Sequence, residues 1–167
     1  MFDVLPPALI MLGGAVLIGL TRGHLRNLFV LGTPLVTLWA VWQIPDGIVA
    51  TVTFLDYLIE PIEGSPVRRL FATIFAVMAF GGGLYAFRQA KWYELAAAYI
   101  YAAGAIGVSF AGDLITFFLY WELMALFSTV VVWCGGTPGA VSYTHLRAHE
   151  TRYTISYAVF CLKKGGG

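Results

Sequence analysis

Charged residues are scarce in this sequence. Asp, Glu, Lys and Arg make up 11% of its 167 residues, whereas a typical soluble domain carries about 25%. The net charge is only +1, which gives no electrostatic reason to expect nucleic acid as a partner. Apolar residues account for 59% of the chain. These values predict an integral membrane protein whose main partner is the lipid bilayer.

Cysteine is equally rare, with only Cys134 and Cys161 in the whole chain. Two thiols form one bridge at most, so they indicate neither a redox compartment nor a metal-binding cluster. The sequence also lacks a glycine-rich nucleotide loop and a nucleophile–base pair. We therefore expect no cofactor, no metal and no enzymatic activity of this chain by itself. Asp3 stands where a signal peptide carries basic residues, so we expect no cleavable signal peptide.

Long apolar runs dominate what is present. A helix that crosses a bilayer needs about 20 mostly apolar residues. Five stretches approach this length, at residues 5–21, 27–43, 69–87, 94–111 and 114–134. We therefore expect an all-α integral membrane fold with about five transmembrane helices. Within the second stretch, Pro34 removes a backbone N–H and predicts a kink.

One long polar connection, residues 44–67, separates the second and third stretches. It contains a Pro-Asp-Gly turn signal at 45–47, a run of β-branched residues and several acids. This pattern predicts a short β-hairpin or extended segment on the membrane surface. The acids have no His or Cys at ligand spacing, so they indicate a solvated face rather than a metal site. We expect Arg68 and Arg69, which follow, to reach the lipid headgroups.

Basic residues without accompanying acids distinguish two of the connections. The first and third hold Arg22, Arg26, Arg88 and Lys91, whereas the second holds Arg68 and Arg69 among four acids and the fourth holds no Lys or Arg. The positive-inside rule places the first and third connections in the cytoplasm. The N-terminus and the long polar connection would then face outward.

Glu122 is the candidate functional residue. It is the only charged residue of the last apolar stretch and lies close to its middle. A charge at that depth costs at least about 2.5–3.5 kcal/mol. One interpretation is a protonated acid that only hydrogen-bonds a neighbouring helix. We favour a proton-transfer site, because burial disfavours the charged form of a carboxyl group and intramembrane acids generally mark ion or proton pathways.

The turn that leads into this stretch is very short. Asp113 follows Gly112 and directly precedes the helix, so we expect it to cap the helix N-terminus. So short a turn makes the fourth and fifth stretches antiparallel neighbours. Ala103, Gly107 and Ala111 recur every four residues and offer a small-residue seam for that contact.

The composition changes abruptly after Gly139. Residues 141–151 and 155–162 resemble in-frame translations of two adapters used in DNA sequencing libraries. They occur in the order of those adapters and are separated by a gap of the size of a sample index. We therefore expect residues 140–167 to be adapter-derived rather than native protein. Residues 1–139 would then be a truncated transmembrane domain.

The rival interpretation of the tail is a cytoplasmic metal site. His145 and His149 are four residues apart, with Glu150 beside them, and two histidines at this spacing on a helix can bind zinc. The adapter match is far more specific because both adapters are present, ordered and in frame. We therefore expect no zinc site here.

Residues 97–133 resemble the fourth and fifth helices of the antiporter-like proton-translocating subunits. The resemblance is most specific in the run Phe-Ala-Gly-Asp-Leu-Ile-Thr-Phe-Phe-Leu-Tyr-Trp-Glu-Leu-Met-Ala at 110–125. These subunits include the large subunits of Mrp-type sodium/proton antiporters and the membrane-arm subunits of respiratory complex I. The Leu-Pro-Pro-Ala-Leu opening at 5–9 and the stretch at 69–80 are similar to the D-type group of the large Mrp subunits in particular.

The resemblance implies that Glu122 matches a fifth-helix glutamate that works with a lysine on a later, broken helix. It further implies a parent protein of about fourteen helices built on inverted repeats. Such a subunit lies in a bacterial inner (plasma) membrane and assembles with other subunits of a membrane complex. This chain ends after the fifth stretch, so any transport activity would belong to the parent.

Three functions remain open at this point. The first is a subunit of a multisubunit antiporter that exchanges protons for a monovalent cation, Na+ being the expected ion. The second is a proton-pumping subunit of a complex I-like NADH:quinone oxidoreductase or a membrane-bound hydrogenase. The third is a purely structural membrane subunit, which a full-length gene without intramembrane lysines would favour.

Genomic sequencing tests the interpretation of residues 140–167. If the tail derives from adapters, genomic reads that cross Gly139 will diverge from the printed sequence and continue as coding sequence for further apolar helices. Independent genomic reads that continue from Gly139 into this same tail would show that the tail is native.

Overall fold

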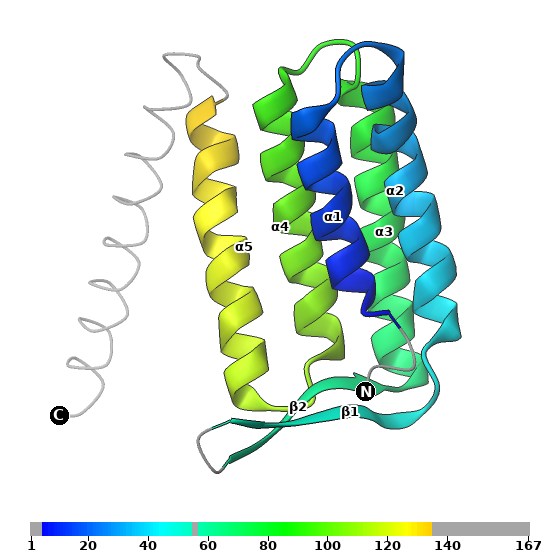
Figure 1. Ribbon diagram of the computed structural model, residues 1–167, viewed down its shortest axis with the longest axis vertical. Coiled ribbons are helices and arrows are strands. Elements are labelled where there is room, and N and C mark those ends of the chain that lie inside the picture. The colour runs from blue at the N-terminus through cyan, green and yellow to red at the C-terminus, as the bar shows by residue number, and fades with distance from the viewer. Residues whose placement is uncertain (1–4, 55–56, 135–167) are drawn as a thin grey trace, which may run out of the picture. The chain divides into compact units, whose positions relative to one another are not determined.

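A computed structural model of the chain describes residues 5–54 and 57–134 (Figure 1). Within them the chain forms five helices and a two-stranded antiparallel sheet. The elements are α1 (Pro7–Leu20), α2 (His24–Gln43), β1 (Gly47–Phe54), β2 (Tyr57–Gly64), α3 (Pro66–Ala86), α4 (Trp92–Phe110) and α5 (Leu114–Cys134). The expected mostly helical fold with a hairpin between the second and third helices is thereby confirmed.

Four of the described helices, α2 to α5, are long and apolar enough to cross a membrane. The first expected span is shorter, because α1 has 14 residues. At a rise of 1.5 Å per residue it extends about 21 Å, less than the ~30 Å of a bilayer hydrocarbon core. Pro7 begins the helix and Thr21 terminates it in an extended conformation. Of the five transmembrane helices expected from the sequence, four are therefore long and apolar enough to cross a membrane, and α1 is a shorter apolar helix.

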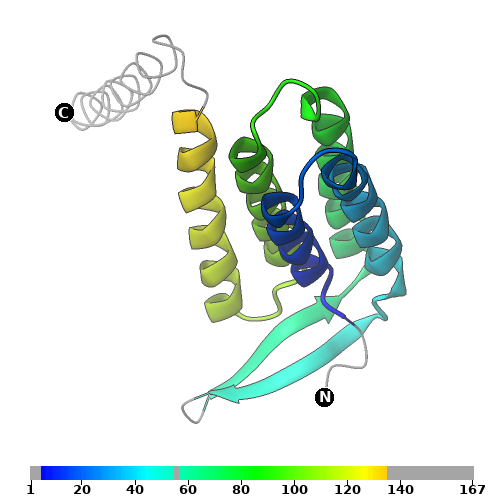
Figure 2. The ribbon, with the colours of Figure 1, turned by 45° about the horizontal axis from the view of Figure 1, so that its top comes forward.

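Helices α1 to α4 form a bundle. Helix α1 contacts α2 and α4, and helix α3 contacts the same two helices, so the four close around a shared core (Figures 1 and 2). The largest fully buried side chains include Met11 of α1, Val30 of α2 and Tyr99 of α4. Helix α3 contributes the smaller buried residues Ala72 and Ala76. Each helix thus contributes apolar residues to the interior, which is what holds the bundle together.

The hairpin lies across one end of the bundle, where α2 and α4 end and α3 and α5 begin (Figure 2). Its register runs from the pair Gly47 and Gly64 to the pair Phe54 and Tyr57. The register shifts twice between Ile48 and Val52, and such irregularities increase the twist of a ribbon. The hairpin is therefore a twisted ribbon beneath the helix ends.

A proline inside α2 creates the main polar contact of the core. The helix continues through Pro34, but proline has no N–H to donate to the carbonyl of Val30, four residues earlier. The Tyr99 hydroxyl of α4 donates a hydrogen bond to that carbonyl instead. Val30 is 0% exposed and Tyr99 is 2% exposed. The bond therefore satisfies a buried group that would be costly to leave unpaired.

A glycine of α3, Gly83, lets this helix approach the Val30 carbonyl closely. A Cβ at Gly83 would collide with the Tyr99 hydroxyl and would lie 3.2 Å from Cγ1 of Val30. Its neighbours Gly81 and Gly82 have nothing within 4 Å of an added Cβ. Of the three consecutive glycines, only the last is required by packing, and it lets α2, α3 and α4 meet at one carbonyl oxygen.

A double-mutant cycle tests this account of Tyr99. Tyr99→Phe should lower the free energy of unfolding by about 1–3 kcal/mol, because it leaves the Val30 carbonyl unpaired in the core. In a Pro34→Ala background the new N–H of residue 34 can bond that carbonyl, so the same change should cost clearly less. Denaturation of the four proteins in detergent gives the comparison. An equal cost in both backgrounds would contradict the account.

Candidate functional site

Helix α5 packs on a glycine surface of α4. A Cβ at Gly104 would come within 3.0 Å of the Tyr120 carbonyl oxygen and 3.1 Å of Cβ of Met124. A Cβ at Gly107 would collide with the Tyr120 ring. The small-residue seam expected from the sequence is therefore confirmed at Gly107. Gly104, rather than Ala103, provides the second contact, and Ala103 lies in the bundle core.

Glu122 lies on the side of α5 that faces away from α4. Two residues along a helix differ by about 200° in direction, so Glu122 points away from the bundle when Tyr120 points toward it. Its side chain is exposed. Leu119 and Leu126, one turn before and after it, are also exposed, at 64% and 62%. Among the described residues, no hydrogen bond or ion pair involves the Glu122 carboxylate.

Little of α5 is covered by the rest of the chain. Thr116 is its only buried residue in the described structure. The burial that the sequence suggested for Glu122 is thus not supplied by helices α1 to α4. A carboxyl group that faces acyl chains alone is costly at bilayer depth. This face of α5 therefore needs a partner from outside the described residues if α5 lies in a membrane.

The start of α5 is held by Asp113, as the sequence predicted. Its Oδ1 accepts hydrogen bonds from the backbone N–H groups of Ile115 and Thr116, both at 2.9 Å. Its Oδ2 accepts one from the backbone N–H of Glu60 in β2 at 3.1 Å. The N–H of Gly112 also donates to the Glu60 carbonyl at 3.0 Å. Asp113 is therefore an N-cap that also joins α5 to the hairpin.

These contacts change the acidity of Asp113. Partial desolvation acts to raise the pKa of its carboxyl group. Hydrogen bonds from the Thr116 side chain and from the N–H groups of Thr116, Ile115 and Glu60 act in the opposite direction and outweigh it. The pKa of Asp113 is accordingly lower than its ordinary value, because donors stabilise the charged form.

Arg68 ties the hairpin to the end of α4. Its Nη2 donates to the carboxylate of Glu63 at 2.6 Å, and its Nη1 donates to the Ala111 carbonyl. The expected reach toward lipid headgroups is not what the structure shows. The side chain of Arg68 is instead about three-quarters buried, at 28% exposure, and it satisfies a carbonyl at the end of α4 that has no helical partner.

Arg69 satisfies a backbone carbonyl at the end of α2 in the same way. Its Nη1 donates to the Ile44 carbonyl at 2.8 Å, and its Nη2 pairs with Asp46 at 2.7 Å. The acids of the hairpin segment are thus partly ion-paired, which the sequence interpretation of a solvated face missed. The sequence feature that could have indicated these ion pairs is the position of two adjacent arginines directly after an acid-rich hairpin.

We call Arg68, Arg69 and Asp113, with their partners, the hairpin clamp.

Metal binding finds no support within residues 5–54 and 57–134. No group of three or more His, Cys, Asp or Glu side chains gathers there in a way that could hold an ion. The alternative zinc ligands His145, His149 and Glu150 lie outside the described residues, as does Cys161.

Replacing Asp113 with Ala should lower the free energy of unfolding by about 1 kcal/mol, the usual cost of losing an N-cap. Because the pKa of Asp113 is lowered in the folded chain, its contribution is fully present above the ordinary carboxyl pKa of about 3.9. The contribution is lost as pH falls through the lowered folded-state pKa.

Denaturation in detergent across a pH series measures this effect. The difference between wild type and Asp113→Ala should shrink below about pH 4. Asp113→Asn keeps a cap acceptor and should cost less than Ala. A difference between wild type and Ala that stays constant down to the lowest accessible pH would show that the Asp113 charge does not contribute.

No family model, curated protein or solved structure matches the chain, so its function rests on the residues and geometry described above.

Proposed function

We propose that this chain is the N-terminal part of a proton-translocating membrane subunit in which Glu122 takes up and releases protons. The observation that carries the proposal is the placement of Glu122. It is the only charged residue of α5, and it lies on the face that α4 leaves uncovered. A membrane helix gains nothing from such a residue in packing alone, because a carboxylate is costly to bury without a partner.

A further helix over this face would complete the site. It would remove Glu122 from lipid and water, and a basic residue on it would stabilise the carboxylate. Movement of such a cation would then change the proton affinity of Glu122, which is how a proton is loaded and released. The hairpin clamp supports this arrangement, since it holds the N-terminus of α5 through Asp113 and thereby the depth at which Glu122 sits.

The proposed parent is a subunit of a multisubunit antiporter that exchanges protons for Na+ or another monovalent cation. The resemblance at residues 110–125 supports this class. The same resemblance supports a bacterial inner membrane, and the distribution of charge supports an N-terminus outside. Arg22, Arg88 and Lys91 lie in the connections at one end of the bundle, opposite the hairpin, and Arg26 lies in the first turn of α2 at the same end (Figure 1), as the positive-inside rule requires of a cytoplasmic end.

Substitution of Glu122 in the full-length parent subunit tests the proposal. Glu122→Gln keeps the size and hydrogen-bonding capacity of the side chain but removes its titratable proton. Cation-dependent proton flux in everted membrane vesicles should fall by about 100-fold, the lower end of what a positioned proton-transfer group contributes. Complex assembly, followed by co-purification of the other subunits, should be unchanged.

Asp113→Asn is the matched control for this experiment. It alters an acid nine positions earlier in the same region but leaves a capping acceptor, so flux should remain close to that of wild type. The 167-residue chain alone, reconstituted in liposomes, sets the baseline. Near-normal flux in an assembled Glu122→Gln complex would show that Glu122 is only a packed, neutral acid.

A further inference from the structure

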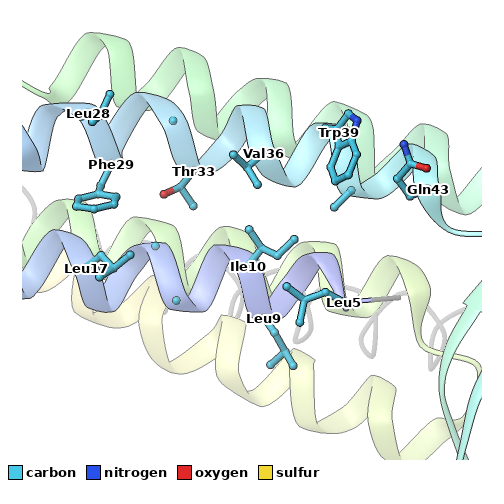
Figure 3. A pocket seen from close by; sticks show the side chains of 14 residues that line it. Leu5, Leu9, Ile10, Leu17, Leu28, Phe29, Thr33, Val36, Trp39 and Gln43 are labelled. Carbon is cyan, nitrogen blue, oxygen red and sulfur yellow. The ribbon is translucent and has the colours of Figure 1, made fainter. Parts of the chain in front are cut away.

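Helices α1 and α2 enclose an open groove of about 920 Å³ (Figure 3). Phe29 and Thr33 of α2 point toward α1 across it, and Ile10 of α1 points toward α2. Apart from Thr33 and Gln43, its lining consists of apolar side chains and glycines. Its volume lies within the range of sites that hold small organic ligands.

The groove exists because of how glycines are placed. A Cβ at Gly14 would collide with the Thr33 side chain, so α1 and α2 approach closely at that position. Gly13 and Gly32 beside this contact have nothing within 4 Å of an added Cβ. They leave the groove open without being needed for the packing of the two helices.

The groove is long enough to hold a lipid acyl chain. Its residues on α2 run from Leu28 to Gln43, a rise of about 22 Å. One leaflet of a bilayer hydrocarbon core is about 15 Å thick, so an acyl chain of a single leaflet fits along it. Apolar side chains of α1 and α2 that lie outside the groove, such as Val16 and Leu35, are exposed at 58% and 50%. They would face the same leaflet.

A basic cluster lies at the end of the groove near the connection between α1 and α2. Arg26 precedes Phe29 by three residues and Thr33 by seven, so it continues the groove-lining face of α2. Its Nε is buried and has no hydrogen-bond partner in the described structure. Arg22 and His24 are exposed beside it. The sequence has no Asp or Glu between Asp3 and Asp46 that could neutralise this cluster from the same helices.

The first turn of α4, at the same end of the bundle, offers one acid, Glu94. Its carboxylate accepts a hydrogen bond from the backbone N–H of Lys91, where it caps α4 and offsets the local charge of the connection that precedes α4. Within the described residues no ion pair involves Arg22, His24 or Arg26, and an anion is the ligand that complements such a cluster.

We propose that the groove binds an anionic phospholipid, with an acyl chain between α1 and α2 and the phosphate held by Arg26 and Arg22. Guanidinium groups bind phosphate oxygens through charge-assisted hydrogen bonds, and no hydrogen bond or ion pair within the described residues occupies the guanidinium of Arg26. Basic pockets between membrane helices on the cytoplasmic side are suited to anionic headgroups. The proposal requires that the chain lies in a membrane, but it does not depend on proton transfer by Glu122.

Native mass spectrometry of the full 167-residue chain in detergent tests this, with phosphatidylglycerol or phosphatidylcholine added. We expect the wild type to retain one phosphatidylglycerol molecule in preference to phosphatidylcholine. Arg26→Gln should reduce that preference about fivefold, the effect of one basic side chain on an anionic lipid. Retention of phosphatidylcholine should not change in this variant.

Two glycine variants separate groove filling from general effects. Gly32→Leu adds a side chain to the groove lining at a position where an added Cβ meets nothing within 4 Å, and it should abolish retention of the lipid. Gly82→Leu places the same side chain on α3, where an added Cβ is equally unobstructed, and should behave as wild type. Equal retention of both lipids by the wild type, or unchanged retention in Gly32→Leu, would overturn the proposal. The proposal would also be overturned if the wild type formed a lipid-free dimer and Gly32→Leu dissociated that dimer, because the groove would then hold a second copy of the chain.

Discussion

The carbonyl oxygen of Val30 is the point on which the four-helix bundle depends. Pro34 removes its normal helical donor, and the Tyr99 hydroxyl replaces that donor from α4. Gly83 leaves the space that this hydroxyl occupies, so α3 is brought to the same position. A buried carbonyl without a donor is costly, and this cost makes the packing of α2, α3 and α4 specific. Apolar contacts alone would allow these helices to slide or rotate with little penalty.

The hairpin clamp has the corresponding role at the end of the bundle. Arg68 and Arg69 satisfy the Ala111 and Ile44 carbonyls that follow α4 and α2, while Asp113 supplies acceptors to the first turn of α5 and to β2. Helix ends leave backbone groups unpaired, and here the hairpin and two arginines pair them. The clamp therefore fixes where α5 starts, which sets the position of Glu122 along the helix.

Two surfaces of the described chain are left for other molecules, and they differ in kind. The outer face of α5 carries one acid among exposed apolar side chains, so it suits a further helix that brings a cation. The groove between α1 and α2 is apolar along its length and basic at one end, so it suits a lipid of opposite charge. Both follow from one condition, that a charge in or beside a membrane needs a complementary partner.

The sequence by itself determined the helices, because apolar runs of about 20 residues have few alternatives to a helix in lipid. It also determined the hairpin through its turn signal and β-branched run, and the cap through the position of Asp113, since these are local effects. It overestimated α1, whose prolines and following Thr21 shorten the helix to 14 residues. Only the tertiary structure decided that Arg68 and Arg69 pair with the hairpin, that Tyr99 reaches Val30, and that Glu122 faces away from α4. These contacts join residues distant in sequence, and their geometry depends on how whole helices pack against one another.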